Sequence, residues 1–291
     1  MITLGDYTTL KVLRQADQGL YLEGDEKNGD ILLPNRYVPK GLTIGDEIEV
    51  FIYLDQEERI IATTEHPLAK VGEFACMEVA WINKYGAFLK WGLMKDLFCP
   101  FREQKKRMEV GKHYIVYVKE DEETHRLMAT AKVERYLEPA PTITPDSVPG
   151  DSVAGAPLKH GQSCDCLIWQ KTDLGFKAII NNRFQGQIYD NQIFQPLHSG
   201  DRLTAYIDHV RQDGKIDITL QPTGRQHTLD FAEIMLRYLY ENDRHCDLSD
   251  KSPAELIADR FKVSKKAFKK AIGDLYRRHL IVLTDDGIHL A

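Results

Sequence analysis

Apolar and polar residues alternate along most of the first 220 or so residues of the chain. The alternation is clearest in three corresponding segments, Ile48 to Ile52, Tyr114 to Val118 and Leu203 to Ile207. A period of two predicts half-buried β-strands, and turn signals rich in Asp, Asn and Gly separate these short runs. About five such strands fit into each stretch of roughly 65 residues, which predicts small closed barrels.

Glycines recur at fixed spacings and divide this region into three units. Gly5, Gly72 and Gly161 are each followed 14 residues later by a second glycine and about 40 residues later by a third. Each unit ends in a short apolar run that closes on threonine. We expect the second glycine to mark a sharp bend or a close approach of the backbone, as at a barrel corner. These second glycines are Gly19, Gly86 and Gly175.

The period changes in the last 65 or so residues. Apolar residues at i, i+3, i+4 and i+7 predict a helix from about Leu229 to Glu241. Ser252 and Ser264 are expected to cap a second and a third helix, and a two-stranded ribbon should follow over 281–284 and 288–290. This layout predicts a winged helix-turn-helix. The expected apolar face of the first helix consists of Phe231, Ile234, Met235 and Tyr238.

The predicted fold class is therefore mainly β with a C-terminal α+β domain. Three tandem five-stranded closed barrels precede the winged helix. A segment rich in Pro, Gly and Ala predicts a semi-stiff, extended linker before the third barrel. The predicted domains are barrel 1 (1–66), barrel 2 (67–136), the linker (137–157), barrel 3 (158–222) and the winged helix (223–291).

Charge is distributed unevenly over these domains. The formal net charge of the whole chain is −6, but barrel 1 carries −7, barrel 2 +3, barrel 3 zero and the winged-helix domain +1. Barrel 1 should therefore repel phosphate, whereas barrel 2 should attract it. The five cysteines are odd in number and form no Cys-x-x-Cys pair, which favours reduced thiols. No long apolar stretch or secretion signal is evident, so we expect a cytoplasmic protein without a membrane partner.

The second repeat contains the clearest motif, Lys84-Tyr85-Gly86-Ala87-Phe88-Leu89. This motif resembles the RNA-binding barrel of the ribosomal S-one type. Three such barrels followed by a winged helix resemble the conserved virulence factor B family (the CvfB or YitL group), and the arrangement covers nearly all of the chain. The resemblance implies an RNA-binding regulator of gene expression of the kind found in Gram-positive bacteria.

The resemblance also implies which residues face the nucleic acid. In that barrel type they are two aromatics on strand two, a histidine on strand three, and an acid and a base around the last hairpin. The matching residues of repeat two are Tyr85, Phe88, Cys99, Asp121 and Arg126, with cysteine in place of the histidine. Those of repeat one are Gln18, Tyr21, Leu33, Asp55 and Arg59. Those of repeat three are Leu174, Lys177, Tyr189, Arg211 and Lys215.

Single-stranded nucleic acid is held by stacking of bases on exposed rings and by a positive groove along the phosphates. We expect Tyr85 and Phe88 to stack bases, with Tyr189 doing so on barrel 3; filling of the barrel or of a domain seam is the alternative for the first two. Phe51, Tyr117 and Tyr206 share one strand position, and packing between barrels is their expected role. The expected phosphate contacts are Lys105, Lys106, Arg126, Lys177, Arg211, Lys265, Lys266 and Lys269.

Two other functions remain open from the sequence. The lysines from Lys265 to Lys270 lie on the helix that reads DNA grooves in winged helices, so a transcription factor on duplex DNA is one alternative. The other is a scaffold on which ribosome-associated proteins dock.

Catalysis and metal binding are not predicted. The chain has no phosphate-binding loop, zinc-protease helix or nucleophile elbow motif. The acidic clusters fall at expected hairpin tips, and Cys164 and Cys166 are expected to fill a barrel interior. We therefore expect a non-enzymatic, cofactor-free protein whose partner is single-stranded RNA.

Overall fold

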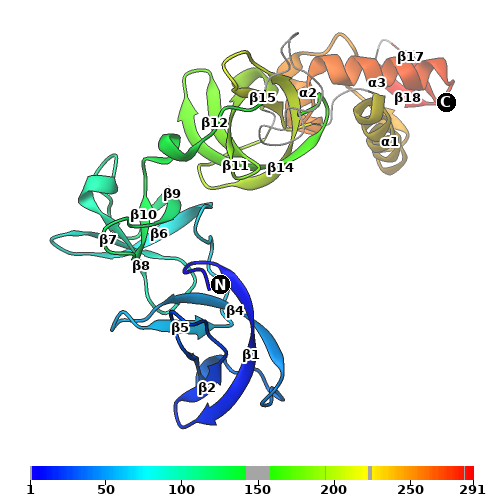
Figure 1. Ribbon diagram of the computed structural model, residues 1–291. Coiled ribbons are helices and arrows are strands. Elements are labelled where there is room, and N and C mark those ends of the chain that lie inside the picture. The colour runs from blue at the N-terminus through cyan, green and yellow to red at the C-terminus, as the bar shows by residue number, and fades with distance from the viewer. Residues whose placement is uncertain (1, 142–157, 194, 222–224, 285) are drawn as a thin grey trace, which may run out of the picture. The chain divides into compact units, whose positions relative to one another are not determined.

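The computed structural model describes residues 2–141, 158–193, 195–221, 225–284 and 286–291. The chain divides into two compact units, Met1–Tyr136 and Leu137–Ala291. Unit 1 contains two closed five-stranded barrels, and unit 2 contains a third barrel and a small helical domain with a three-stranded sheet (Figure 1). The predicted fold class is confirmed. No helix of the described residues is long and apolar enough to cross a membrane.

All three barrels have the same topology. Going round each barrel, the order is first, second, third, fifth and fourth strand, and only the third and fifth run parallel. Barrel 1 consists of β1 (Tyr7–Ala16), β2 (Gly19–Leu22), β3 (Ile31–Pro34), β4 (Glu47–Leu54) and β5 (Ile60–Thr63). Barrel 2 consists of β6 (Phe74–Ile82), β7 (Gly86–Lys90), β8 (Leu97–Pro100), β9 (His113–Glu120) and β10 (Leu127–Thr130). Barrel 3 consists of β11 (Ser163–Thr172), β12 (Gly175–Ile180), β13 (Phe184–Tyr189), β14 (Arg202–Val210) and β15 (Ile216–Thr219).

The repeated glycine that opens each second strand is required by close backbone contact. A Cβ atom on Gly19, Gly86 or Gly175 would lie 2.0, 2.4 or 2.0 Å from a carbonyl oxygen of the neighbouring strand. Only glycine fits such an approach. The prediction drawn from the 14-residue spacing is therefore confirmed in all three barrels.

A β-bulge interrupts the first strand of every barrel at the same place. The pairing register shifts between Val12 and Arg14, between Val79 and Trp81, and between Ile168 and Gln170. A bulge bends the strand and changes the direction of the next side chain. The residue after each bulge pairs with the third residue of the second strand, giving the pairs Arg14–Tyr21, Trp81–Phe88 and Gln170–Lys177.

Barrels 1 and 2 share one hydrophobic cluster. Phe51, Tyr53 and Ile61 of barrel 1 belong to the same buried cluster as the interior of barrel 2. The Phe51 ring meets the ring of Trp91 edge-on at 5.9 Å between centroids. The packing role predicted for Phe51 is confirmed.

The corresponding residues of the other barrels pack differently. The ring of Tyr117 stacks on the ring of Tyr136, with 4.1 Å between the centroids. Tyr136 lies in the short 3₁₀ helix η3 (Val133–Tyr136) of unit 1. Tyr206 of barrel 3 is half-buried. A buried contact with the neighbouring barrel is thus observed for Phe51, and the same role for Tyr117 and Tyr206 stays a prediction.

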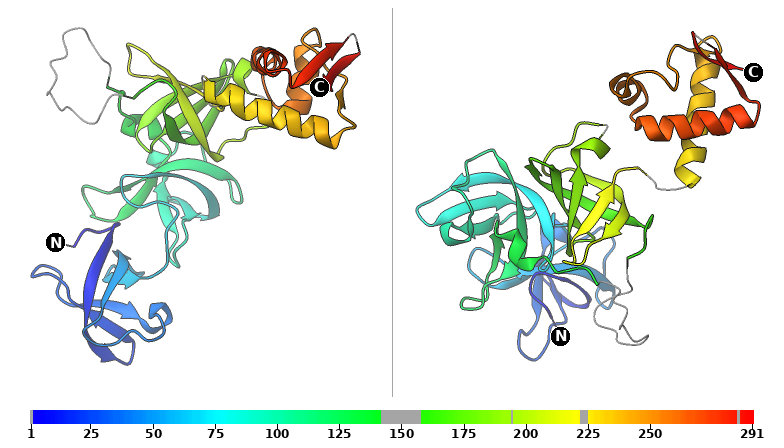
Figure 2. Two further views of the ribbon diagram at one scale, coloured as in Figure 1. Left: turned by 90° about the vertical axis from the view of Figure 1, so that its right-hand side faces the viewer. Right: turned by 90° about the horizontal axis from the view of Figure 1, so that it is seen from above.

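The helical domain has the predicted winged-helix layout. Its elements are α1 (Arg225–Glu241), β16 (His245–Cys246), α2 (Ala254–Phe261), α3 (Lys265–Arg277), β17 (Ile281–Thr284) and β18 (Gly287–Leu290). Helix α3 crosses α1, and both contribute to one buried cluster (Figure 2). The sheet order is β16-β18-β17, so the expected two-stranded ribbon has a third short strand.

Two details of the helix predictions are wrong. Ser252 does not cap α2, because its hydroxyl accepts the backbone N–H of Ser249 at 2.8 Å and Pro253 occupies the cap position. Ile234 is 51% exposed. The buried face of α1 follows i, i+4 and i+8 instead, with Phe231, Met235 and Leu239. Ser264 does cap α3, accepting the N–H of Ala267 at 3.1 Å.

The predicted linker is described only over residues 137–141; the rest of it lies outside the described residues, as does Asp285 of the predicted ribbon turn. Glu138 forms a parallel bridge with Phe184, and Ala140 is buried in the core of barrel 3. The described part of that segment therefore packs on barrel 3.

Candidate nucleic-acid interface

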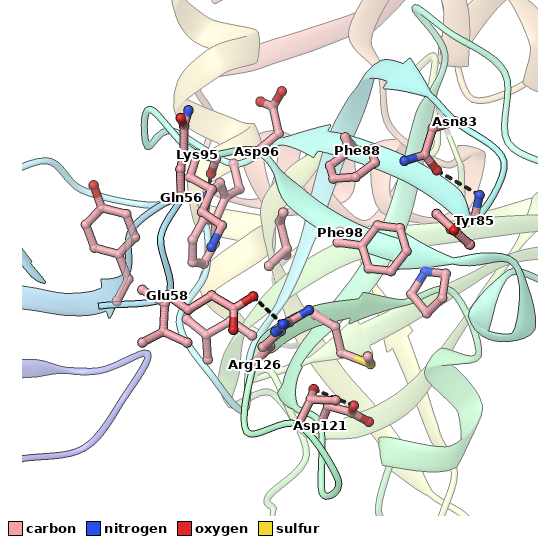
Figure 3. Close-up of a pocket in the computed structure, with 18 of the residues that line it drawn as sticks. Gln56, Glu58, Asn83, Tyr85, Phe88, Lys95, Asp96, Phe98, Asp121 and Arg126 are labelled. Atoms are coloured by element: carbon pink, nitrogen blue, oxygen red, sulfur yellow. Dashed lines mark hydrogen bonds and ion pairs between the residues drawn. The ribbon is translucent and has the colours of Figure 1, made fainter. Parts of the chain in front are cut away.

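A groove of about 840 Å³ lies within unit 1. Most of its lining comes from barrel 2, and the β4–β5 hairpin of barrel 1 contributes Gln56 and Glu58 (Figure 3). Four of the residues predicted for the face of repeat two line it, namely Tyr85, Phe88, Asp121 and Arg126.

An aromatic stack forms part of the groove wall. The rings of Trp81 and Phe88 lie 3.7 Å apart at an interplanar angle of 4°, and Phe98 lies 4.9 Å from Phe88. The bulge in β6 brings Trp81 into register with Phe88. The indole N–H donates to the Asp96 carboxylate at 2.9 Å, which fixes the ring while leaving it 45% exposed. We call Trp81, Phe88 and Phe98 the aromatic stack.

Tyr85 lies beside Asn83 at the edge of the groove (Figure 3). Its backbone N–H donates to the Asn83 side-chain oxygen at 2.8 Å, and its carbonyl accepts the N–H of Phe101 at 3.1 Å. The side chain is nevertheless 62% exposed, with the Lys84 ammonium 4.9 Å from the ring. Tyr85 therefore does not fill the barrel, and its ring is available at the surface.

The cations of the groove are held by groups of the same unit. Arg126 forms an ion pair with Glu58, which belongs to the hairpin of barrel 1 (Figure 3). Arg102 lies 3.4 Å from the Asp121 carboxylate. Lys95 Nζ donates to the backbone carbonyl of Asp55 at 2.6 Å, and burial lowers the pKa of its ammonium group. A phosphate entering the groove would therefore compete with these partners for the cations.

Cys99 does not occupy the face predicted for it. Its side chain is fully buried, and burial raises the pKa of the thiol to about 12. The register pairs Gly86 with Pro100, so Pro100 faces outward and Cys99 inward. A slip of one residue moves a strand residue to the opposite face. The same slip applies to Leu33 of barrel 1, which is also buried.

The corresponding face of barrel 1 is covered by its own charges. The Arg14 guanidinium lies 3.7 Å over the Tyr21 ring and pairs with Asp30 at 3.3 Å. Arg59 pairs with Asp55 in the last hairpin at 2.8 Å. Tyr21 is thus engaged by a cation on one ring face.

Barrel 3 has no aromatic pair at the bulge position. Lys177 stands where barrel 2 has Phe88, and its ammonium lies 5.4 Å from the Trp169 ring. Gly175 pairs with Tyr189, so Tyr189 lies on the expected face. Its hydroxyl accepts a hydrogen bond from Arg211 at 2.5 Å, and Arg211 also pairs with Asp217. Tyr189 and Arg211, predicted as separate contacts, thus form one cluster. Lys177 pairs with Gln187 on the neighbouring strand, two residues from Tyr189.

The remaining predicted cations lie outside the groove lining. Lys105 pairs with Glu134, and Lys106 is exposed in the loop after the 3₁₀ helix η2 (Phe101–Glu103). In α3, Lys265 donates to the carbonyl of Lys251 at 3.4 Å. Lys269 lies 4.0 Å from Asp250. Lys266 is exposed.

Sequence reasoning missed most of the groove lining, including Trp81, Phe98 and Glu58. Phe98 could have been found from strand alternation, because it pairs directly with Phe88. Trp81 depends on a bulge, and Glu58 depends on how the two barrels pack. Neither has a local sequence signal.

The closed five-stranded barrel with this strand order defines the oligonucleotide-binding barrel class. Residues 4–65 match the family model of the S1 domain, and residues 233–290 match that of the CvfB-like winged helix domain. The resemblance to the conserved virulence factor B group, predicted from the sequence, is confirmed. Both matched domain types are nucleic-acid-binding domains, and the two matches cover residues 4–65 and 233–290 of the chain.

Relatives cover most of the chain. The protein YitL of Bacillus subtilis is 28% identical over 274 residues, which is 94% of this chain and 89% of YitL. Conserved virulence factor B of Staphylococcus aureus (strain N315) is 23% identical over 247 residues, or 82% of this chain and 78% of that protein. A crystal structure of a multidomain protein with nucleic acid binding domains from Streptococcus pneumoniae is 20% identical, covers 99% of this chain and 98% of its own, and has a TM-score of 0.43.

Proposed function

We propose that this protein binds single-stranded RNA in the groove of barrel 2 and thereby regulates gene expression after transcription. Bases would stack on Tyr85 and on the aromatic stack, and Arg126 would contact a phosphate. No catalytic step is part of the proposal, and the cytoplasm is the proposed location.

The observation that carries this proposal is the aromatic stack beside the exposed Tyr85 ring. Aromatic faces that are fixed by neighbouring bonds yet open to solvent suit stacking of unpaired bases, which contributes about 1–3 kcal/mol per base. Paired bases in a duplex keep their faces covered by one another, so such a surface favours single strands.

The distribution of charge supports the same placement. Barrel 2 carries a net charge of +3, whereas barrel 1 carries −7 and would repel a nucleic acid from its own surface. Glu58 brings one of these acidic groups to Arg126 in the groove. On RNA binding, Arg126 would therefore exchange the Glu58 carboxylate for an RNA phosphate, so that its charge would stay paired.

The regulatory part of the proposal rests on the relatives. One relative, from Staphylococcus aureus, is named conserved virulence factor B, and residues 233–290 of this chain match the CvfB-like winged helix domain. Helix α3 presents Lys266 and Lys269 as further phosphate contacts. The remaining proposed RNA contacts are Tyr189, Arg211, Lys177, Lys105, Lys106 and Lys265.

Fluorescence anisotropy with the full chain tests the proposal. Labelled uridine-rich and adenine-rich RNA oligonucleotides compete with duplex DNA at two fixed salt concentrations, because affinities depend steeply on salt. Tighter binding of single-stranded RNA supports the proposal. Preference for duplex DNA would favour a transcription factor, and negligible RNA affinity near physiological salt would favour a protein scaffold.

A further inference from the structure

Two histidines and one aspartate meet at the base of the wing in the winged-helix domain. His245 in β16 and His289 in β18 are direct partners in the antiparallel register. Asp286 lies immediately before β18. The backbone pairing of β16 with β18 therefore brings the two imidazoles together from positions far apart in the sequence.

The three side chains point their donor atoms to one place. One ligand atom from each of them lies within 4.8 Å of the other two. His289 Nε2 is 3.3 Å from an Asp286 carboxylate oxygen, and the two imidazole centroids are 4.6 Å apart. His245 Nε2 is 3.4 Å from the backbone carbonyl of Asp286.

This donor set and spacing suit a divalent transition metal. Ligand atoms in a tetrahedral zinc site with bonds of about 2.0–2.1 Å are about 3.3 Å apart. Side-chain rotations that bring the ligand atoms about 1.5 Å closer would therefore close the observed spacing of up to 4.8 Å. Imidazole and carboxylate are ligands that zinc accepts, and three protein ligands leave one position for water.

We propose that His245, Asp286 and His289 bind one zinc-type divalent cation. The bound ion would tie β16 to the turn that enters β18 and so hold the wing against the body of the domain. This site belongs to the winged helix and does not depend on the groove of barrel 2.

Titration of the full chain with zinc chloride, in the presence of a thiol-free reductant, tests this proposal. Isothermal titration calorimetry should show one site, and a thermal melt should shift upward with zinc because the ion binds the folded state. His245→Ala and His289→Ala should each weaken the affinity at least tenfold. Asp286→Asn should weaken it as well, and this exposed substitution leaves the strands intact.

His279→Asn provides the matched control. His279 lies in the same domain, is exposed, and has a positive φ of 55° that asparagine tolerates. It should bind zinc like the parent protein. Equal affinity in His245→Ala and His279→Asn, or no saturable binding at about 100 μM zinc, would overturn the proposal.

Discussion

Barrels 1 and 2 share a scaffold but differ in the chemistry of their surfaces. Both have the same strand order, the same corner glycine and the same bulge. The S1 family model matches residues 4–65, in barrel 1. The exposed aromatic groove, however, belongs mainly to barrel 2. Resemblance in the scaffold and capacity to bind are therefore separate properties.

The difference is clearest at the pair of residues that follows the bulge. In barrel 1 this pair is Arg14 with Tyr21, and a guanidinium covers the ring. In barrel 2 it is Trp81 with Phe88, and two rings stack while Trp81 stays exposed. The backbone geometry is common, so the side chains alone decide whether a base could stack there.

The largest expected effect is a loss of stability when the hydrophobic cluster shared by barrels 1 and 2 is disrupted. Phe51→Ala removes a fully buried ring from the joint cluster and should lower the free energy of unfolding by about 3–5 kcal/mol. Tyr206→Ala at the same position of barrel 3 should cost about 1 kcal/mol, because that ring is half-buried. Urea denaturation followed by circular dichroism measures both. Equal losses would mean that the joint cluster of barrels 1 and 2 stabilises the fold no more than the half-buried site of Tyr206 does.

The next effect concerns stacking. Tyr85→Ala combined with Phe88→Ala should weaken binding to a uridine- or adenine-rich RNA by about tenfold or more, because two stacking surfaces are lost. Fluorescence anisotropy at fixed salt measures the change.

Tyr21→Ala in barrel 1 is the matched control for this variant. Its ring occupies the position of Phe88 but is covered by Arg14, so affinity should change less than about twofold. If Tyr21→Ala weakened binding as much as the double variant, the contrast between the barrels would be wrong.

A smaller effect is expected from the groove cation. Arg126→Ala should weaken RNA binding about three- to tenfold and reduce the slope of log affinity against log salt by about 1, because one phosphate contact is lost. Arg59→Ala, the corresponding change in barrel 1, should leave both quantities unchanged. An unaltered salt slope in Arg126→Ala would remove this residue from the proposed site.

The smallest effect is an expected gain. Glu58→Gln removes the carboxylate that holds Arg126 and should strengthen RNA binding about two- to fivefold, since an exposed ion pair contributes little but competes with phosphate. Glu57→Gln has the same charge change, yet Glu57 pairs with Arg59 of barrel 1 and should have a smaller effect. Weaker binding by Glu58→Gln would show that Glu58 supports the site.

The sequence predicted the barrels because the strand period and the corner glycines are local properties. At Gly86, for example, a Cβ atom would lie 2.4 Å from a carbonyl oxygen, so only glycine fits there. The same constraint recurs at a fixed spacing in each barrel. Tyr85 and Phe88 were found from a local motif for the same reason. The winged helix followed from its helical period and the Ser264 cap.

The sequence did not reveal features that depend on register or on contact between barrels. Cys99 was assigned to the wrong face, because an error of one residue in the strand register moves a side chain from one face of the sheet to the other. Trp81 reaches the groove only through a bulge, which no residue pattern marks. The pairing of Glu58 with Arg126 and of His245 with His289 joins segments distant in sequence, so it requires the fold.

Photocrosslinking tests the central claim most directly. A single-stranded RNA carrying 5-iodouridine is irradiated with the full chain, and the attached peptides are mapped by mass spectrometry. The account predicts adducts on Trp81, Tyr85, Phe88 or Phe98 in barrel 2. Adducts confined to residues 1–66 or 158–291, with none in barrel 2, would contradict it.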